Sequence, residues 1–233
     1  MSSYKGHSIF ALILALMFFH TPLMIALTVI GANIPDFDHK LKKDNVYRMI
    51  ILGLIVFISL YVLKLPYFIG LIIIFLGVCF YFSQHRSFTH SIFGILTLSA
   101  SVSLILIWSY QLLVNVTVLD NDYMIMAILI ALISFLFLNK RVLLIFLPLF
   151  FLSLFIFPDM GINIIEIPLS LALGLFSHTV LDAFTPSGIK LFAPLSDKKV
   201  YKNFALASVF ILIIMAIVIH IPILFSFFNV YVS

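Results

Sequence analysis

Charged side chains are scarce in this sequence, and their scarcity excludes most soluble folds. Asp, Glu, Lys and Arg together make up 9% of the 233 residues, whereas apolar residues make up 64%. The mean hydropathy is +1.28. Soluble domains carry about 25% charged residues. The composition therefore predicts a membrane protein, and nothing in the residues leads us to expect nucleic-acid binding.

Cysteine and linker sequences are also nearly absent. The single cysteine, Cys79, lies within an apolar segment, so it cannot form an internal disulfide and is expected to be a structural thiol. No long Gly/Ser-rich, Pro-rich or repeated stretch divides the chain. We therefore expect residues 1–233 to form a single integral membrane domain.

Apolar segments follow one another along almost the whole chain. They cover approximately residues 8–19, 21–34, 46–63, 67–84, 90–114, 123–138, 142–157, 164–184 and 203–228. This pattern predicts an all-α fold, a polytopic transmembrane helical bundle of about seven to nine apolar helices. A full crossing takes about 20 residues. The first two segments are shorter, so they predict either a pair of short crossings or a re-entrant hairpin.

The basic residues distinguish the two faces of the predicted bundle. When the connections are assigned alternately to two sides, 12 of the 13 Lys and Arg residues fall on one side. Only Lys64 falls on the other side, together with Asp120, Asp122 and Asp159. By the positive-inside rule the basic side is cytoplasmic. This predicts a multi-pass protein of the cytoplasmic (inner) membrane, with the N-terminus in the cytoplasm and the C-terminus outside.

His and Asp residues gather in four groups at the ends of the apolar segments, all on the predicted cytoplasmic side. Ionisable side chains are costly in a membrane and are kept mainly where they bind or react. Imidazole nitrogens and carboxylate oxygens are also ligands for divalent metal ions. The candidate metal ligands are His7, Asp36, Asp38, His39, His85, His90, His178 and Asp182.

Spacing supports two of these groups. His178 and Asp182 are four residues apart, which places both on one face of a helix; the alternative is a helix-stabilising pair. Pro35 disfavours helix in the residue before it, so Asp36 and Asp38 would follow a helix end. In an extended stretch these two carboxylates would point the same way. The alternative is a solvated interfacial turn.

His85 and His90 are five residues apart, which is wrong for one helical face. They fit one site if His85 lies in the turn and if Ser87 or Thr89 caps the helix that carries His90. Arg86 would then lie beside the metal and could bind a phosphate through two hydrogen bonds. Anchoring at the cytoplasmic face is the alternative for this arginine.

The turn after residue 184 and two further histidines can also be explained without a functional role. Thr185 and Ser187 can line a polar turn in which backbone N–H groups bind an anion, although an ordinary helix stop gives the same pattern. His20 and His220 fall toward the opposite side of the predicted bundle. We interpret both histidines as structural or interfacial.

Taken in order, these motifs resemble those of a known family. They are Gly6-His7, PDFDH over residues 35–39, HRSFTHS over residues 85–91 and SHTVLDAFTPSG over residues 177–188. The chain is similar to the YdjM-type inner-membrane proteins, which are described as metal-dependent hydrolases and as LexA-binding membrane proteins. The resemblance implies that the His and Asp residues form a metal site with hydrolase activity.

The leading hypothesis is a membrane-embedded metal-dependent hydrolase that acts on a lipid or lipid-linked phosphate ester at the cytoplasmic membrane face. One or two divalent ions, Zn or Mn, would be held by the His and Asp side chains. Asp36 or Asp38 would accept a proton, while Arg86, Thr89 and Thr185 would hold an anionic group. The alternative is a metal-binding membrane protein without hydrolysis, either a transporter or a scaffold.

Overall fold

The computed structural model describes residues 4–36, 43–83, 87–116, 121–158 and 160–232, and these residues are almost entirely helical. The predicted all-α bundle is confirmed, and most helices begin and end within a few residues of the predicted segments. The helices are α1 (Tyr4–Phe18), α2 (Pro22–Gly31), α4 (Lys43–Val62), α5 (Phe68–Phe82), η1 (Phe88–His90, a 3-10 turn), α6 (Ile92–Val116), α7 (Asp122–Phe137), α8 (Lys140–Ile156), α9 (Glu166–Ala183) and α10 (Lys202–Val232).

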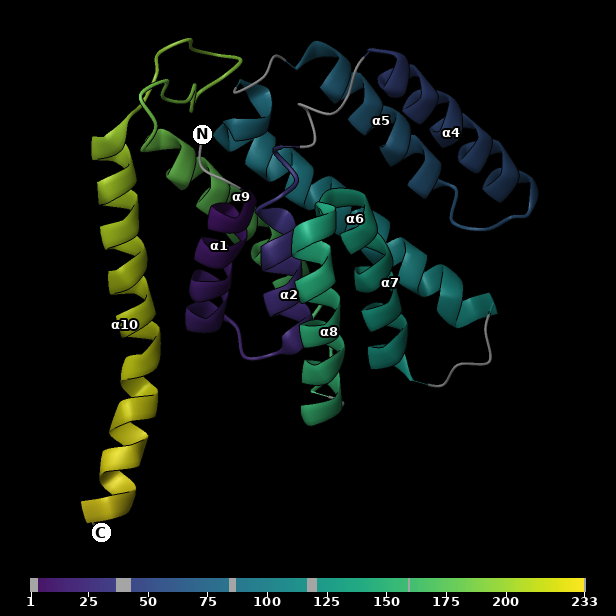
Figure 1. Cartoon of the computed structure of the whole chain (residues 1–233). Coiled ribbons are helices and arrows are strands. Elements are labelled where there is room, and N and C mark those ends of the chain that lie inside the picture. Colours follow the sequence, from purple (N-terminus) through teal and green to yellow (C-terminus); the bar gives the residue numbers. More distant parts are fainter. Residues whose placement is uncertain (1–3, 37–42, 84–86, 117–120, 159, 233) are drawn as a thin grey trace.

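The first two helices form an antiparallel hairpin, and its second arm is the centre of the bundle (Figure 1). Pro22 is the first residue of α2. Proline is favourable there because an N–H group at the first helical position would have no acceptor within the helix. Nine of the ten residues of α2 are buried. A ten-residue helix rises only about 15 Å, half of a hydrocarbon core about 30 Å thick. Its neighbours enclose this short arm, as a short segment in a membrane requires.

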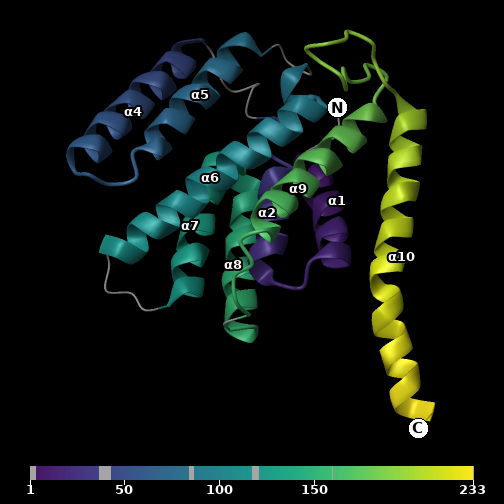
Figure 2. The ribbon, with the colours of Figure 1, turned by 180° about the vertical axis from the view of Figure 1, so that it is seen from behind.

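Helix α9 packs directly against α2, as the view from behind shows (Figure 2). The contact is close because glycine lies on both sides of it. A Cβ atom added to Gly174 would lie 2.1 Å from the carbonyl oxygen of Thr28, and one added to Gly31 would lie 2.6 Å from that of Leu171. Small residues allow this backbone-to-backbone approach between membrane helices. The approach fixes the C-terminal ends of both helices at one level.

The remaining helices surround this pair. Helix α6 crosses α9, α7 packs on α6 and α2, and α8 lies beside α1 and α2. Helices α4 and α5 form a separate hairpin that contacts the rest of the described chain mainly through α6 (Figure 1). Helix α10 lies at the other edge against α9 and α1. The N-terminal end of α1, the C-terminal ends of α2 and α9, and the start of α6 therefore meet at one end of the bundle.

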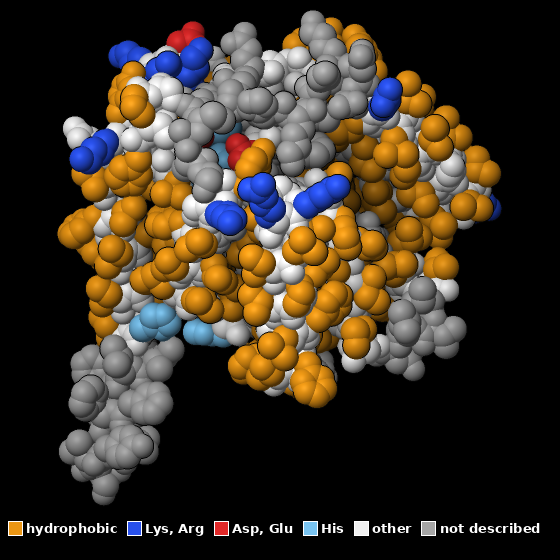
Figure 3. Space-filling view, viewed as in Figure 1, with side chains coloured by type: hydrophobic (Ala, Val, Ile, Leu, Met, Phe, Trp, Pro, Cys, Tyr) orange, Lys and Arg blue, Asp and Glu red, His pale blue; other side chains and the backbone are white. Residues whose placement is uncertain are grey.

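The outside of the bundle is apolar below this end. Large side chains such as Leu144 and Phe155 are 75% and 84% exposed. In the space-filling view, Lys and Arg side chains gather on the upper part of the molecule, above a broad hydrophobic surface (Figure 3). Among the described helices, Ile92–Val116 and Lys202–Ile221 are long and apolar enough to cross a membrane, while other apolar helices are shorter. The surface is that of a protein surrounded by lipid.

Replacing Gly174 by Ala tests the importance of the α2–α9 contact. Within a helix this change ordinarily stabilises by about 1 kcal/mol. Here the new methyl group would meet the backbone of α2, and overpacking costs about 1–3 kcal/mol. We expect a lower midpoint of thermal unfolding in detergent. Leu169→Ala, which changes an exposed residue of the same helix, is the control and should leave the midpoint nearly unchanged. An unchanged or raised midpoint for Gly174→Ala would contradict the importance of this contact.

Candidate metal centre

The structure brings five of the eight predicted metal ligands together at the end of the bundle where the helix ends meet. His7 lies in the first turn of α1, Asp36 in the turn after α2, and His90 at the end of η1. His178 and Asp182 lie in the last two turns of α9. Residues more than 170 positions apart in the sequence are therefore neighbours in space.

Asp182 lies at the centre of this group. Its Oδ1 atom is 3.5 Å from His7 Nε2, and its Oδ2 atom is 3.3 Å from His90 Nε2 and 3.7 Å from His178 Nε2. The side chain of Asp182 is 6% exposed, and the three histidines are 0–2% exposed. A buried carboxylate is costly unless its charge is neutralised and its oxygens are bound. The three imidazoles, or an ion bound between them and the carboxylate, can balance this buried charge.

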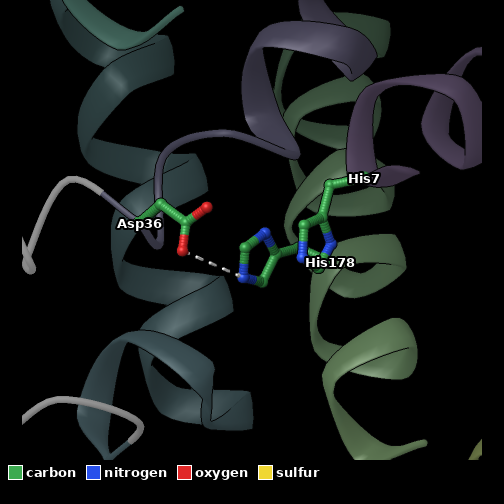
Figure 4. Close-up of side chains that lie close together, drawn as sticks. All are labelled: His7, Asp36 and His178. Carbon is green, nitrogen blue, oxygen red and sulfur yellow. Dashed lines mark ion pairs between the residues drawn. The ribbon is translucent and has the colours of Figure 1, made fainter. Parts of the chain in front are cut away.

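Asp36 approaches His178 from the turn after α2 (Figure 4). Its Oδ1 atom is 3.8 Å from His178 Nε2, and its side chain is 21% exposed. The rings of His7 and His178 are stacked, with centroids 3.8 Å apart and planes 11° apart. His178 Nε2 thus faces two carboxylates, a buried one on its own helix and a partly exposed one after α2.

The backbone of α2 determines which nitrogen of His178 faces the carboxylates. His178 Nδ1 is 2.7 Å from the carbonyl oxygen of Ala32. A carbonyl oxygen can only accept a hydrogen bond, so Nδ1 carries the proton and Nε2 of the neutral ring presents its lone pair. Nε2 is buried and has no hydrogen-bond partner among the described residues. Such an oriented and unused lone pair is what a metal ligand requires.

His90 is oriented in a comparable way, but not by the predicted helix cap. The Thr89 hydroxyl oxygen is 2.9 Å from His90 Nδ1, which directs Nε2 toward Asp182. Ser87 directly precedes the 3-10 turn that carries His90, but its side chain makes no capping hydrogen bond. His90 ends this turn before α6, and the Ser91 hydroxyl accepts the hydrogen bond from Gly94 N–H. Ser91, the residue before α6, is therefore the cap of that helix.

The distances in this group are characteristic. All four nitrogen–oxygen distances lie between 3.3 and 3.8 Å, whereas a hydrogen bond between such atoms spans about 2.7–3.2 Å. Two ligands that each lie about 2.0–2.2 Å from one tetrahedral ion are about 3.3–3.6 Å apart. Two overlapping triads have ligand atoms close enough to hold an ion, namely His7, Asp36 and His178, and His90, His178 and Asp182. The donor set and its spacing fit a divalent metal ion.

The loop after α9 covers this end of the bundle. Ile189 and Val200 pair across it, and the N–H group of Ile92 donates to the carbonyl of Leu191, which attaches the loop to the start of α6. On its exposed side the Lys190 ammonium is 2.6 Å from Asp197 Oδ1 and lowers the pKa of that carboxyl. The loop therefore holds the start of α6 and the end of α9 together. Neither of the two triads formed by described residues includes a carboxylate from this loop.

The remaining site predictions either fall outside the described residues or meet a different local structure. Asp38, His39, His85 and Arg86 lie outside the described residues. Asp36 lies in a turn and not in the expected extended stretch, because N–H groups after α2 bond back to carbonyls of its last turn. The Thr185 hydroxyl donates to the Asp182 carbonyl and is 2.9 Å from the Ser187 hydroxyl, so it closes the helix end. Its proposed contact with an anion stays a prediction.

Sequence reasoning missed the residues that support the ligands. Asn33, 1% exposed, donates to the Ser8 hydroxyl and to the Val29 carbonyl, and so ties the end of α2 to α1 beside His7. A lone amide within an apolar segment was the available signal.

His220, interpreted from the sequence as structural, lies 3.0 Å from the Met17 carbonyl. This contact joins α10 to the far end of α1.

Removing the Thr89 hydroxyl tests whether it orients a ligand. We expect Thr89→Val to weaken Zn²⁺ binding by about 10–100-fold, the usual effect of losing a hydrogen bond to a ligating histidine. Competition with a chromophoric chelator measures the change. Thr179→Val is the matched control, since the buried Thr179 hydroxyl donates within its own helix to Leu175. Equal Zn²⁺ affinity for the wild type and Thr89→Val would show that the hydroxyl does not orient His90 for metal.

Comparison with known proteins agrees with the membrane character of the fold. No curated protein and no solved structure gives a significant match to this chain. A family model does match, and the match covers residues 1–231, nearly the whole sequence. The described helices, the apolar surface and the length of this match lead to one conclusion: the chain belongs to the YdjM inner membrane protein family.

Proposed function

We propose that this protein is a membrane-embedded metal-dependent hydrolase that acts on a lipid or lipid-linked phosphate ester. The observation that carries the proposal is the spacing of the buried His and Asp atoms, 3.3–3.8 Å, which suits a shared ion better than direct hydrogen bonds. His/Asp donor sets favour Zn or Mn among the divalent ions. Because the two triads share the one available nitrogen of His178, they can hold one ion together, and a second ion would need other ligands.

His7, Asp36, His90, His178 and Asp182 would hold the metal, with Asp38, His39 and His85 as further candidates from the sequence. A divalent ion bound there would supply Lewis-acid chemistry, lowering the pKa of a water molecule and polarising the ester bond. The residues of the chain have distinct tasks around it. Asp182, buried among three imidazoles, supplies negative charge and position and is shielded from bulk water.

Asp36 is the better placed of the two described carboxylates to accept a proton. Its side chain is 21% exposed, compared with 6% for that of Asp182. A group that takes a proton from water needs access to water and a position within reach of the reacting atoms. Arg86 and Thr185 would bind the phosphate of the substrate, and Thr89 would act through His90. Asp38 is the alternative base.

The position of the centre supports a lipid substrate. The ligands lie at one end of the bundle, and the outer surface beside them is apolar. A lipid can place its head group at the ligands while its chains stay in the hydrocarbon. A transport path would instead need ionisable groups through the bundle. The buried polar side chains along the described helices are mostly Ser and Thr, and several of them bond to their own helix, among them Thr28, Ser134 and Ser170.

The distribution of basic residues orients the protein. With 12 of the 13 basic residues assigned to the end that carries the His and Asp groups, that end would be cytoplasmic. The N-terminus would lie in the cytoplasm and the C-terminus outside. The hydrolase would then meet lipids of the cytoplasmic leaflet.

Metal content and turnover together test the proposed hydrolase. We expect detergent-purified wild-type protein to contain nearly stoichiometric Zn or Mn by mass spectrometry, and Asp182→Ala and His90→Ala to lose most of it. Asp36→Asn should retain more metal but lower kcat by about 10²–10⁴-fold on phospholipid vesicles, the usual contribution of a general base. Phosphate or head-group release is the readout.

The control for this experiment is His220→Ala, which changes a histidine at the other end of the bundle and should keep both metal and turnover. If the wild type binds neither Zn nor Mn after reconstitution, while the variants fold normally, the metal-hydrolase proposal fails. Metal without turnover on any phosphate ester of a lipid would instead favour a non-catalytic metal-binding protein.

Accessibility of single cysteines tests the orientation. In a Cys79→Ser background, Leu195→Cys lies in the loop beside the metal centre and Ile164→Cys in the turn before α9, and both original side chains are exposed. A membrane-impermeant maleimide should label Ile164→Cys in intact cells and Leu195→Cys only after permeabilisation. The reverse pattern would invert the topology and move the centre to the outer leaflet.

A further inference from the structure

A groove of about 470 Å³ lies between α1, α2 and α8, on the side of α1 away from the metal centre. Its lining residues come mainly from α1, α2 and α8. Between the ends its lining is apolar and includes Leu12, Leu16, Ile25, Ile145 and Leu149. The volume is in the range of small-molecule pockets, roughly 300–1,000 Å³. The groove is partly open to the outside of the bundle, as a site filled from the surrounding membrane must be.

Positive charge marks one end of this groove. Lys5 is the second residue of α1, Arg141 is the second residue of α8, and both line the groove. The two helices run in the same direction (Figure 1), so both cations lie at the end that also carries His7. The N-terminal ends of two helices add to the favourable potential for an anion. At the other end the lining residues are His20 and Phe157.

The length of the groove corresponds to one leaflet of a bilayer. From Lys5 to Leu16 the axial rise of α1 is about 16 Å, at 1.5 Å per residue. Half of a hydrocarbon core about 30 Å thick is about 15 Å. An apolar chain lying between α1 and α8 would therefore reach from the level of the cations to about the middle of the membrane.

We propose that this groove binds one anionic phospholipid molecule, with one acyl chain along α1 and α8 and its phosphate between Lys5 and Arg141. A phosphate accepts hydrogen bonds from both cations, whereas the apolar helix of a second copy would leave them without a counter-charge. Ser8 lines the groove and bonds to Asn33, and its neighbour His7 belongs to the metal centre. The bound lipid is distinct from the phosphate ester that Arg86 and Thr185 would hold at the metal centre, so this site goes beyond the proposed function.

Retention of lipid by the purified chain tests this site. Full-length protein is reconstituted in phosphatidylcholine vesicles that contain a minority of phosphatidylglycerol, extracted with mild detergent, and analysed for bound lipid by mass spectrometry. We expect one phosphatidylglycerol per wild-type chain. Leu12→Trp and Ile145→Trp, which fill the groove, should abolish retention. Lys5→Gln combined with Arg141→Gln should reduce the preference for the anionic lipid by about tenfold.

Matched variants separate the groove from the rest of the surface. Ile13→Trp and Leu144→Trp add the same side chain to the same helices at exposed positions outside the groove, and Lys140→Gln removes a neighbouring charge that does not line it. These three should retain lipid like the wild type. Equal retention in groove and control variants overturns the proposal. So does an altered oligomeric state in the groove variants with unchanged lipid, because that result assigns the groove to a second copy.

Metal content, measured in the same samples, separates this proposal from the hydrolase proposal. Loss of lipid in the groove variants with the metal retained supports the groove. Retained lipid together with metal but without turnover in the wild type leaves the groove standing and removes the hydrolase. If the wild type has metal and turnover but retains no lipid selectively, the groove proposal fails and the hydrolase proposal stands.

Discussion

The close contact between α2 and α9 is the constraint on which the rest of the structure depends. Gly31 and Gly174 allow the two backbones to touch. One turn beyond Gly174, His178 then meets the carbonyl of Ala32, the residue that follows α2. That hydrogen bond fixes the protonated nitrogen of the imidazole and turns the other nitrogen toward two carboxylates. A contact between small residues thus determines the chemistry of a polar site several residues away.

The His/Asp cluster around Asp182 is notable because its polar groups are buried. Asp182 and three imidazoles are almost completely buried, at separations longer than an ordinary hydrogen bond. The group is costly to assemble inside a membrane protein unless something is bound there. Ser8, which follows His7 in the sequence, lines a separate apolar groove with cations at one end. That groove suits a molecule with an anionic head and an apolar chain.

Much of the architecture was predictable, because helices in lipid must satisfy their own backbone and therefore appear as long apolar segments. The segment ends agree with the helix ends to within a few residues for most helices. Alternating the segments across the membrane also brought His7, Asp36, His90, His178 and Asp182 to one end without any knowledge of packing. The local details were less predictable. Asp36 lies in a turn, and Ser91 caps α6, because tertiary contacts and local hydrogen bonds compete for the same polar groups.

The sequence by itself determined the class of protein, the approximate positions and order of the described helices and the end at which the His and Asp residues gather, since these follow from hydropathy and from alternation across a membrane. Only the tertiary structure decided which ligands touch, which nitrogen of His178 is available, and that a charged-ended groove lies between α1 and α8. The physical reason is that hydropathy acts on each segment separately. Distances of 3–4 Å between side chains depend instead on how closely two particular helices can approach, and here that approach is set by glycines that hydropathy does not distinguish.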